Sequence, residues 1–211
     1  MRPILLICGI IAALCFVATD IAGAILYPDY SFSDQAVSEL FAIGAPTSRI
    51  VAPLFTLSSF LLMAFAIGVW LSSGHSRLLR LMAAMFAGSA LIGVILWNFF
   101  PMHMRGAEPT FTDTMHLILA TNPFVVLSIV FAVAVFRGWF RLYTVATFVM
   151  LLLPAVFAFQ YAMEVQENLP TPGLGLGERV AQYAYALWQS TLAIVLRRKR
   201  NSEAHYPRSE A

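Results

Sequence analysis

The chain has 211 residues; 60% of them are hydrophobic, 11% are charged, and the formal net charge is +2. A soluble domain carries about 25% charged residues, so this chain has too little charge to cover a globular surface in water. The composition excludes an ordinary soluble domain and predicts a protein whose surface mostly contacts lipid.

Six apolar runs follow one another along the chain, each about 20 residues long and therefore able to cross about 30 Å of hydrocarbon as a helix. They cover residues 4–26, 50–71, 79–100, 114–136, 142–162 and 179–196. We therefore expect an all-α integral membrane protein. One domain, residues 1–200, would form a bundle of six transmembrane helices, and residues 201–211 would form a short polar tail.

The distribution of basic residues predicts the orientation of the bundle, because Lys and Arg concentrate in cytoplasmic loops. If the amino terminus is inside, ten of the thirteen Lys and Arg residues lie on the inner side, and Arg49, Arg105 and Arg179 lie outside. Both termini would then be cytoplasmic, in a plasma or bacterial inner membrane. We interpret the RRKR segment at 197–200 as an anchor at anionic lipid headgroups, and we expect no nucleic-acid partner.

The first apolar run permits a second interpretation. Its basic start and its Ala22-Gly23-Ala24 segment are also typical of a secretory signal with a cleavage site. We expect the helix to be retained, because the run continues apolar to Leu26.

The segment between the first two runs has an amphipathic pattern. Val37, Leu40 and Phe41 fall on one helical face, and Ser38 and Glu39 are polar. This pattern predicts a short amphipathic helix in the first outer loop, lying on the outer surface. It would be either a connector at the membrane interface or a lid over a pocket.

The third run carries small residues four positions apart, at Ala84 and Gly88 and again at Ser89 and Gly93. Such spacing lets helix backbones approach closely. It predicts a packing seam, used either within the bundle or by a second copy or another partner.

Polar side chains gather between the third and fourth runs. His103 and Arg105 lie in the connecting segment, and Asp113 and His116 are three residues apart at the start of the fourth run. That spacing places the last two on one helical face. An N-cap role for Asp113 and an interfacial position for His116 explain the same pattern.

Two later runs carry polar stripes at helical spacing. The first stripe comprises Gln160, Glu164 and Glu167, and the second comprises Glu178, Gln182, Tyr185 and Gln189. Because polar groups that face lipid are costly, the stripes predict a polar cavity open to the outside, walled by the first, fourth, fifth and sixth helices. A structural polar network that holds the helices in register explains them equally well.

Two more specific expectations follow from the same polar residues. Arg179 has no basic neighbour on its side of the membrane, so we expect it to pair with an outer carboxylate. Five side chains are expected to converge on one site near the outer leaflet, namely Asp20, Asp113, His116, Glu164 and Glu178.

Such a site would bind or process a lipid or another amphipathic small molecule. As a metal-dependent hydrolase, it would use His103, His116 and Asp113 to hold a divalent ion. The catalytic candidates are Asp113, His116 and Glu178. The binding candidates are Asp20, Ser38, Glu39, Gln160, Glu164, Arg179, Gln182 and Tyr185.

Other chemistries have less support. Only two histidines lie on the outer side, the sequence has no HExxH motif, and haem is not expected, because it needs axial histidines at membrane depth. A Ser38 nucleophile with His116 lacks an elbow motif. The alternative class is a protein without enzymatic activity: a carrier, a lipid-binding protein or a scaffold.

Several short motifs, in their order along the chain, resemble the uncharacterised membrane family known as domain of unknown function 998. They are Ser38-Glu39-Leu40 with Gly44-Ala45-Pro46, Phe99-Phe100-Pro101 with Asp113 and His116, and Gly177-Glu178-Arg179 with Leu187-Trp188. The resemblance spans nearly the whole chain and implies a bundle of about six membrane helices, with no established activity. The segment after Pro101 departs from the pattern, having His103 and Arg105 in place of an early acidic residue.

Overall fold

The computed structural model describes residues 1–205, and the side chains of all of these except 153–159, 162 and 199–205. Its elements are α1 (Arg2–Leu26), the 3-10 helix η1 (Val37–Phe41), α2 (Ser48–Trp70), α3 (Arg77–Leu91), the π-helix η2 (Ile92–Leu96), α4 (Trp97–Phe99), α5 (Phe111–Ala120), α6 (Pro123–Val135), α7 (Trp139–Gln160), α8 (Ala162–Gln166) and α9 (Leu174–His205). Within residues 1–205 there is no strand, only an isolated backbone bridge between Ile43 and His103. The all-α prediction is confirmed.

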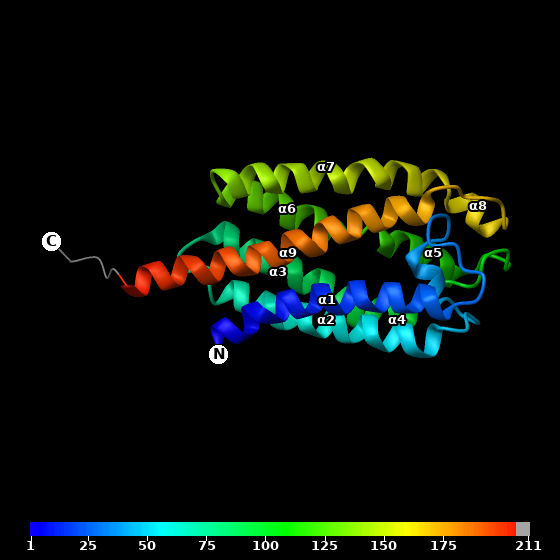
Figure 1. The fold of residues 1–211 in the computed structure, drawn as a ribbon, viewed down its shortest axis with the longest axis horizontal. Helices are drawn as coiled ribbons and strands as arrows, with labels where there is room; N and C mark the ends of the chain where they lie inside the picture. Colours follow the sequence, from blue (N-terminus) through cyan, green and yellow to red (C-terminus); the bar gives the residue numbers. More distant parts are fainter. Residues whose placement is uncertain (206–211) are drawn as a thin grey trace.

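The long helices run side by side along one axis (Figure 1). Four segments are long and apolar enough to cross a membrane, namely Arg2–Leu26, Ser48–Trp70, Arg77–Phe99 and Phe111–Val135, and a shorter apolar helix covers Trp139–Leu152. This is the architecture of a helical membrane protein. The amino terminus lies at the same end of the bundle as the far end of α9, and the three long connections gather at the opposite end (Figure 1). We call that opposite end the long-loop end; it contains residues 27–47, 100–110 and 167–173.

Two of the predicted helices contain interruptions. The fourth run divides into α5 and α6 at Asn122, whose φ of 30° is left-handed, and Pro123, which has no N–H to donate, begins the second half. The third run is one segment, but η2 inserts a π turn just before Trp97. Such turns re-aim the side chains that follow them and are frequent at functional sites.

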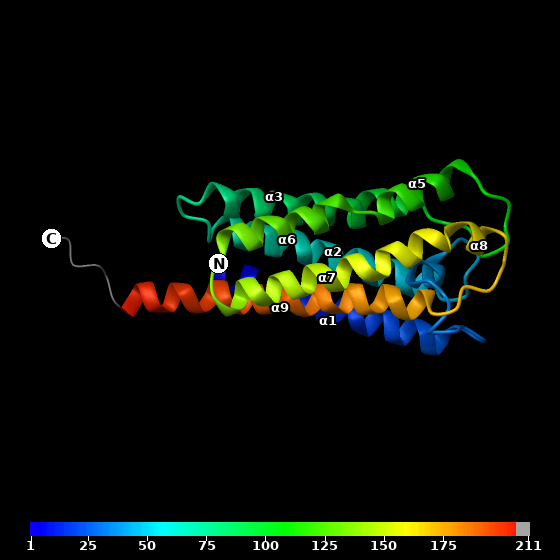
Figure 2. The ribbon, with the colours of Figure 1, turned by 90° about the horizontal axis from the view of Figure 1, so that it is seen from above.

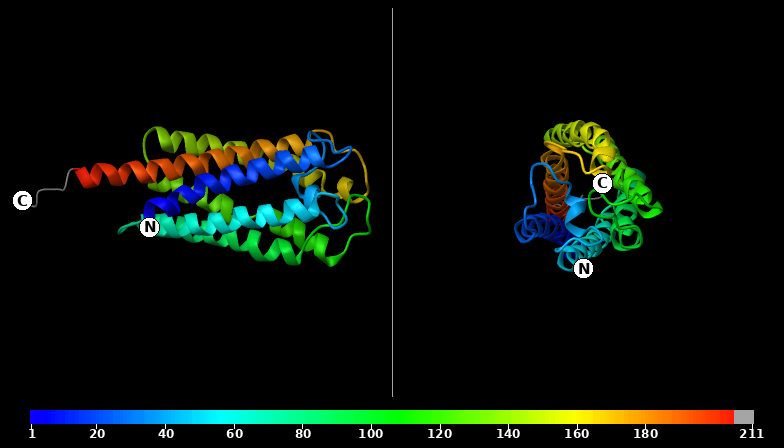
Figure 3. Two further views of the ribbon diagram at one scale, coloured as in Figure 1. Left: turned by 60° about the horizontal axis from the view of Figure 1, so that its bottom comes forward. Right: turned by 90° about the vertical axis from the view of Figure 1, so that its right-hand side faces the viewer.

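The first long loop contains a short helix, as predicted, but this helix does not lie on the surface. Instead of an amphipathic helix on the outer surface, it forms the short helix η1, which is inserted among the helix ends (Figure 3). Leu40 is fully buried, and Val37 and Phe41 pack against Val51 and Phe55 of α2. The apolar face that would have contacted lipid instead contacts protein, so the expectation of a surface helix was wrong.

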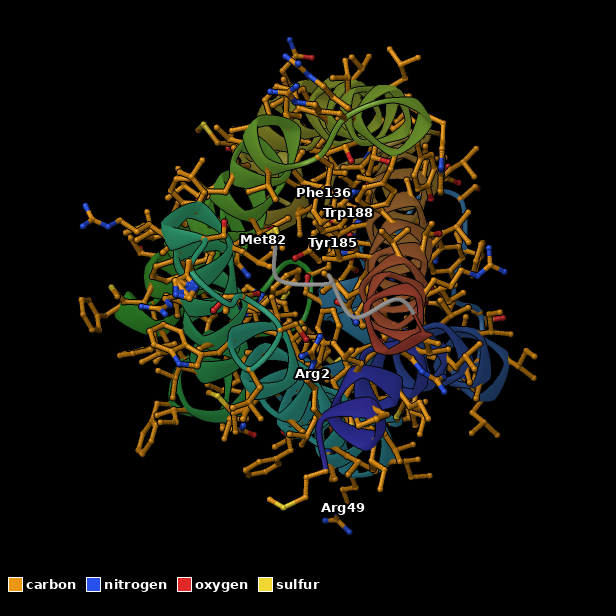
Figure 4. The ribbon with its side chains drawn as sticks, turned by 90° about the vertical axis from the view of Figure 1, so that its left-hand side faces the viewer. Arg2, Arg49, Met82, Phe136, Tyr185 and Trp188 are labelled. Atoms are coloured by element: carbon orange, nitrogen blue, oxygen red, sulfur yellow. The ribbon has the colours of Figure 1, made fainter. Side chains whose placement is uncertain are left out.

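The core lies in the half of the bundle away from the long loops. Phe65, Phe86 and Trp188 are fully buried there, and the indole N–H of Trp188 donates to the Thr144 hydroxyl at 3.0 Å. In the end-on view Met82, Phe136, Tyr185 and Trp188 lie inside the bundle, whereas Arg49 points away from it (Figure 4). The small-residue seam is used within the chain: a Cβ at Gly88 would meet Phe124 of α6, and one at Gly93 would meet Ser59 of α2.

Helix pairing leaves α5 loosely attached. α7 packs along α9, and α3 packs against α2 and α6 (Figure 2). In contrast, α5 packs against the short helix α4, and in the described part of the chain it does not pack closely along α7, α8 or α9. The long-loop half of the bundle is therefore less closed on the α5 side than the core half.

Candidate functional site

A cavity of about 170 Å³ lies at the long-loop end, between α5 on one side and α8 and α9 on the other. η1 and the segment 101–110 cover it. Its polar wall contains Ser38, His103, Arg105, Asp113, His116, Tyr161, Gln166, Glu178 and Gln182. Its larger apolar side chains are Phe16, Phe41, Phe55, Trp97, Met102, Met104, Leu117, Val165 and Leu174. One chamber thus joins an aromatic wall to a set of polar groups.

Beside the cavity, a buried ion pair fixes the first long loop. Arg179 of α9 is 1% exposed and Asp20 of α1 is fully buried. Arg179 Nε and Nη2 donate to the two carboxylate oxygens of Asp20 at 2.9 and 2.8 Å, and the Tyr183 hydroxyl donates to the same carboxylate. The prediction that Arg179 is paired is confirmed, but its partner is Asp20 within α1 and not one of the outer carboxylates.

The same guanidinium holds loop backbone. Arg179 Nη1 donates to the carbonyl oxygens of Phe32 at 2.8 Å and of Gln35 at 3.2 Å, and the guanidinium lies 3.8 Å from the centre of the Phe32 ring. Its Nη2 also donates to the Tyr30 hydroxyl. Burial raises the pKa of the Tyr30 phenol, so this hydroxyl stays neutral. Arg179 is therefore fully engaged in structure, with no donor left for a ligand.

A second ion pair joins the three long loops. Arg105 donates from Nη2 and Nε to the two oxygens of buried Glu39, at 2.8 and 3.1 Å. It also donates to the Leu169 carbonyl and the Thr171 hydroxyl. Hydrogen bonds from the Gly173 N–H, and then from the hydroxyls of Ser31 and Ser33, lower the pKa of the half-buried Asp34 carboxyl. These contacts tie the cover of the cavity together.

Asp113 orders the entrance to α5. One oxygen accepts the backbone N–H of His103 at 2.7 Å, and the other accepts the backbone N–H of Thr110 at 2.8 Å. The second oxygen also lies 2.9 Å from His103 Nδ1. A carboxylate only accepts hydrogen bonds, so the network assigns a proton to Nδ1 of His103. The other ring nitrogen, Nε2, is not used by Asp113. The N-cap interpretation of Asp113 was wrong in position: Thr110 is the N-cap residue of α5, and Asp113, the third helical residue, accepts the Thr110 N–H as part of a capping box.

His116 is held in a fixed orientation against the aromatic wall. It is 3% exposed, its Nδ1 lies 3.0 Å from the carbonyl oxygen of Phe100, and its ring stacks on Trp97 with centroids 5.8 Å apart. The carbonyl requires a proton on Nδ1. The Nε2 atom makes no hydrogen bond to any residue that the structure describes.

Three polar groups on the cavity wall are incompletely paired. Glu178 accepts only the Val37 N–H, through Oε2 at 2.9 Å. The indole N–H of Trp97 and the side-chain oxygen of Gln182 are buried, and neither has a hydrogen-bond partner in the described part of the chain. Glu178 and Gln182 are four residues apart on α9, so they present two acceptors on one face.

A family model described as "Protein of unknown function (DUF998)" matches residues 10–195. The chain belongs to the DUF998 family. No curated protein and no solved structure matches it. Membership confirms the resemblance carried by the sequence motifs, and it leaves the activity to be inferred from the site.

The DUF998 chain brings some of the predicted site residues together and separates others. Six line the cavity: Ser38, His103, Asp113, His116, Glu178 and Gln182. Asp20, Glu39 and Arg179 lie in the two ion pairs instead. Gln160 is exposed, Glu164 is not part of the wall, and the Tyr185 hydroxyl contacts Ser128 near the core.

Of the five residues expected to converge on one site, three therefore do so. Asp113, His116 and Glu178 share the cavity, Asp20 lies behind Arg179, and Glu164 lies off the wall. Sequence reasoning did not single out Trp97 as a site residue. It was noticeable only as a tryptophan near a helix end, which is a common place for this residue in membrane proteins.

The three predicted metal ligands do not form a coordination set. Among the described residues, no group of three or more His, Cys, Asp or Glu side chains could hold a metal ion. The reason is local: both oxygens of Asp113 are occupied in capping α5 and holding His103, and His116 is turned toward Phe100 and Trp97. The arrangement suits hydrogen bonding to a ligand better than chelation.

Proposed function

We propose that this DUF998 protein binds a lipid or another amphipathic small molecule in the cavity at its long-loop end. The observation that carries the proposal is the pair of unpartnered buried groups, the Trp97 N–H and the Gln182 oxygen, on the wall of one cavity. A buried polar group without a partner costs about 1–3 kcal/mol. A ligand with one acceptor and one donor would remove both costs.

The cavity favours a molecule with a polar and an apolar part. Its volume of about 170 Å³ resembles the about 150 Å³ of a cavity that holds benzene, so it suits a headgroup or a short molecule. Leu117, on the wall, is also 42% exposed on the face of α5. Because α5 does not pack closely along α7, α8 or α9 in the described residues, an apolar tail would leave the cavity toward lipid beside Leu117.

The proposed setting is a multi-pass membrane protein with six spans and both termini in the cytoplasm. α7 and α9 would be the fifth and sixth spans, in addition to the four segments that qualify by length and composition. Support comes from ten basic residues on one side and from the amino terminus and the far end of α9 lying at one end of the bundle (Figure 1). The cavity would then open toward the outer leaflet of a plasma or bacterial inner membrane.

The binding proposal is tested by what the protein retains on purification. Full-length protein extracted in mild detergent is analysed by mass spectrometry for bound amphiphiles, alongside Gln182→Leu and Trp97→Phe. We expect the unaltered protein to retain an amphiphile. The retained amount should fall at least tenfold in both variants, because each loses one hydrogen bond to the ligand. Gln160→Leu is the matched control, since Gln160 is exposed and off the wall. Equal retention in all four proteins, or none in any, contradicts the proposal.

A second candidate function is hydrolysis of a bound ester, and the specific observation is the His103–Asp113 pair. With Nδ1 held by a carboxylate, a neutral His103 has Nε2 free to accept a proton from water, as a general base requires. We expect p-nitrophenyl octanoate to be hydrolysed, and His103→Gln to lower the rate at least 100-fold. His75→Gln, at the other end of the bundle, should leave the rate unchanged. A rate that His103→Gln does not alter eliminates this candidate.

A further inference from the structure

The charges around the cavity identify what kind of headgroup it suits. Two arginines lie in or beside it, Arg105 and Arg179, and each makes a two-pronged pair with a carboxylate, Glu39 and Asp20 respectively. His103 is engaged with Asp113. Among the described acidic side chains of the wall and these pairs, Glu178 is the one that forms no ion pair. It accepts a single backbone N–H.

The α9 wall is therefore an acceptor surface. Glu178 contributes a carboxylate whose second oxygen is unpaired, and Gln182, one turn further along, contributes a buried oxygen that lacks a donor. A carboxylate withdrawn from water is stabilised by an opposite charge that also donates hydrogen bonds. A primary ammonium group has three N–H donors, so it can satisfy both oxygens at once.

The opposite wall suits the same cation. Trp97 lines the cavity and stacks with Phe41 at 5.7 Å between ring centroids, and Phe16 and Phe55 also line it. Aromatic faces attract cations, and most strongly those that have been withdrawn from water. The unpartnered Trp97 N–H adds a donor, which calls for an acceptor oxygen on the ligand.

We infer that the ligand's headgroup carries a primary ammonium, bound between Glu178 and Gln182, with an acceptor oxygen a short distance away that accepts the Trp97 N–H. This inference rests on the proposed binding function and names its ligand class. The chemistry is that of a 2-aminoethanol unit, and it occurs both in lipid headgroups and in small free amines.

The test compares three probes on the full-length protein in phosphatidylglycerol nanodiscs, with binding followed by native mass spectrometry. They are dihexanoyl phosphatidylethanolamine, its N-acetylated derivative, which lacks the cation, and free ethanolamine. We expect the phosphatidylethanolamine to bind at least tenfold more tightly than the N-acetylated probe. Tighter binding of the lipid than of ethanolamine identifies a lipid source, and the reverse order identifies a free amine; either order supports the ammonium.

Glu178→Gln is the diagnostic variant, because glutamine keeps an oxygen for the Val37 N–H and removes only the charge. It should abolish the tenfold preference for the ammonium. Glu167→Gln, which removes an exposed carboxylate from the same end of the bundle, should preserve it. Equal binding of the lipid and its N-acetylated derivative overturns the ammonium inference and leaves amphiphile binding intact, whereas failure of all three probes overturns both proposals.

Discussion

Arg179 shows how one side chain can organise a whole end of a membrane protein. Its guanidinium joins α1, through Asp20, to the backbone of the first long loop. Neither member of the pair is at the surface, so each charge depends on the other for compensation. Removing one partner of a buried pair typically costs about 3–5 kcal/mol, because the other charge is left in a poorly solvating site.

Arg179→Ala should therefore lower the stability of the protein in detergent by several kcal/mol, whereas Arg49→Ala should change it little. Arg49 is exposed and points away from the bundle (Figure 4). The measurement is thermal unfolding followed by circular dichroism. Adding Asp20→Asn to Arg179→Ala should restore part of the loss, since it removes the stranded charge. Equal destabilisation by the two alanine variants would disprove a special role for the buried pair.

The stability of the folded protein should depend on pH through Asp34. Hydrogen bonds from Gly173, Ser31 and Ser33 lower the pKa of its carboxyl in the folded protein, so the charged form is favoured by folding. The resulting stabilisation is present above the unfolded pKa of about 4 and disappears as the pH falls through the lower folded value. Unfolding temperatures measured between pH 6 and pH 3 should fall less steeply for Asp34→Asn than for the unaltered protein. Parallel curves would show that Asp34 contributes nothing there.

The break between α5 and α6 determines where the α5 residues of the cavity wall lie. Asn122 has the left-handed conformation that asparagine tolerates and most side chains do not, and its amide donates to Ser89 at 2.9 Å. The break lies two residues beyond Ala120, the last wall residue of α5. A continuous helix would carry Asp113 and His116 to a different angle around the axis.

Two substitutions at Asn122 separate backbone from side chain. Asn122→Gly loses the bond to Ser89 but keeps the turn, whereas Asn122→Val loses both. We expect the valine variant to be less stable than the glycine variant by about 1–2 kcal/mol, the cost of a left-handed conformation, measured by chemical unfolding in detergent micelles. Identical stabilities would mean that the break does not depend on the residue at this position.

The elements also show what a sequence pattern can and cannot reveal. The lengths of the apolar runs correctly predicted α1, α2 and α3. The helical spacing of polar residues correctly predicted that Glu178 and Gln182 lie on an inward face of α9. The same amphipathic pattern describes a helix on lipid and a helix against protein, so the burial of η1 was not predictable from periodicity. Pairings between distant residues, such as Arg105 with Glu39, depend on the tertiary fold and have no local signal.

For the whole molecule, the orientation in the membrane is the prediction with the widest consequences. Reporter fusions after Leu71, after Phe136 and in the tail should report a cytoplasmic location, and fusions within 101–113 and 167–177 should report an external one. The physical reason is the retention of Lys and Arg on the cytoplasmic side. A tail that reads external would place the cavity on the other face of the membrane.

The pair of Asp20 and Arg179 also has a consequence for biosynthesis. The two residues are 159 positions apart, and chains are synthesised at about 5–20 residues per second, so Asp20 waits about 8 to 30 s for its partner to leave the ribosome. During this interval the first helix holds an uncompensated carboxylate at the membrane. A chain that terminates before α9 lacks Arg179, so its first helix keeps a carboxyl group without its cationic partner.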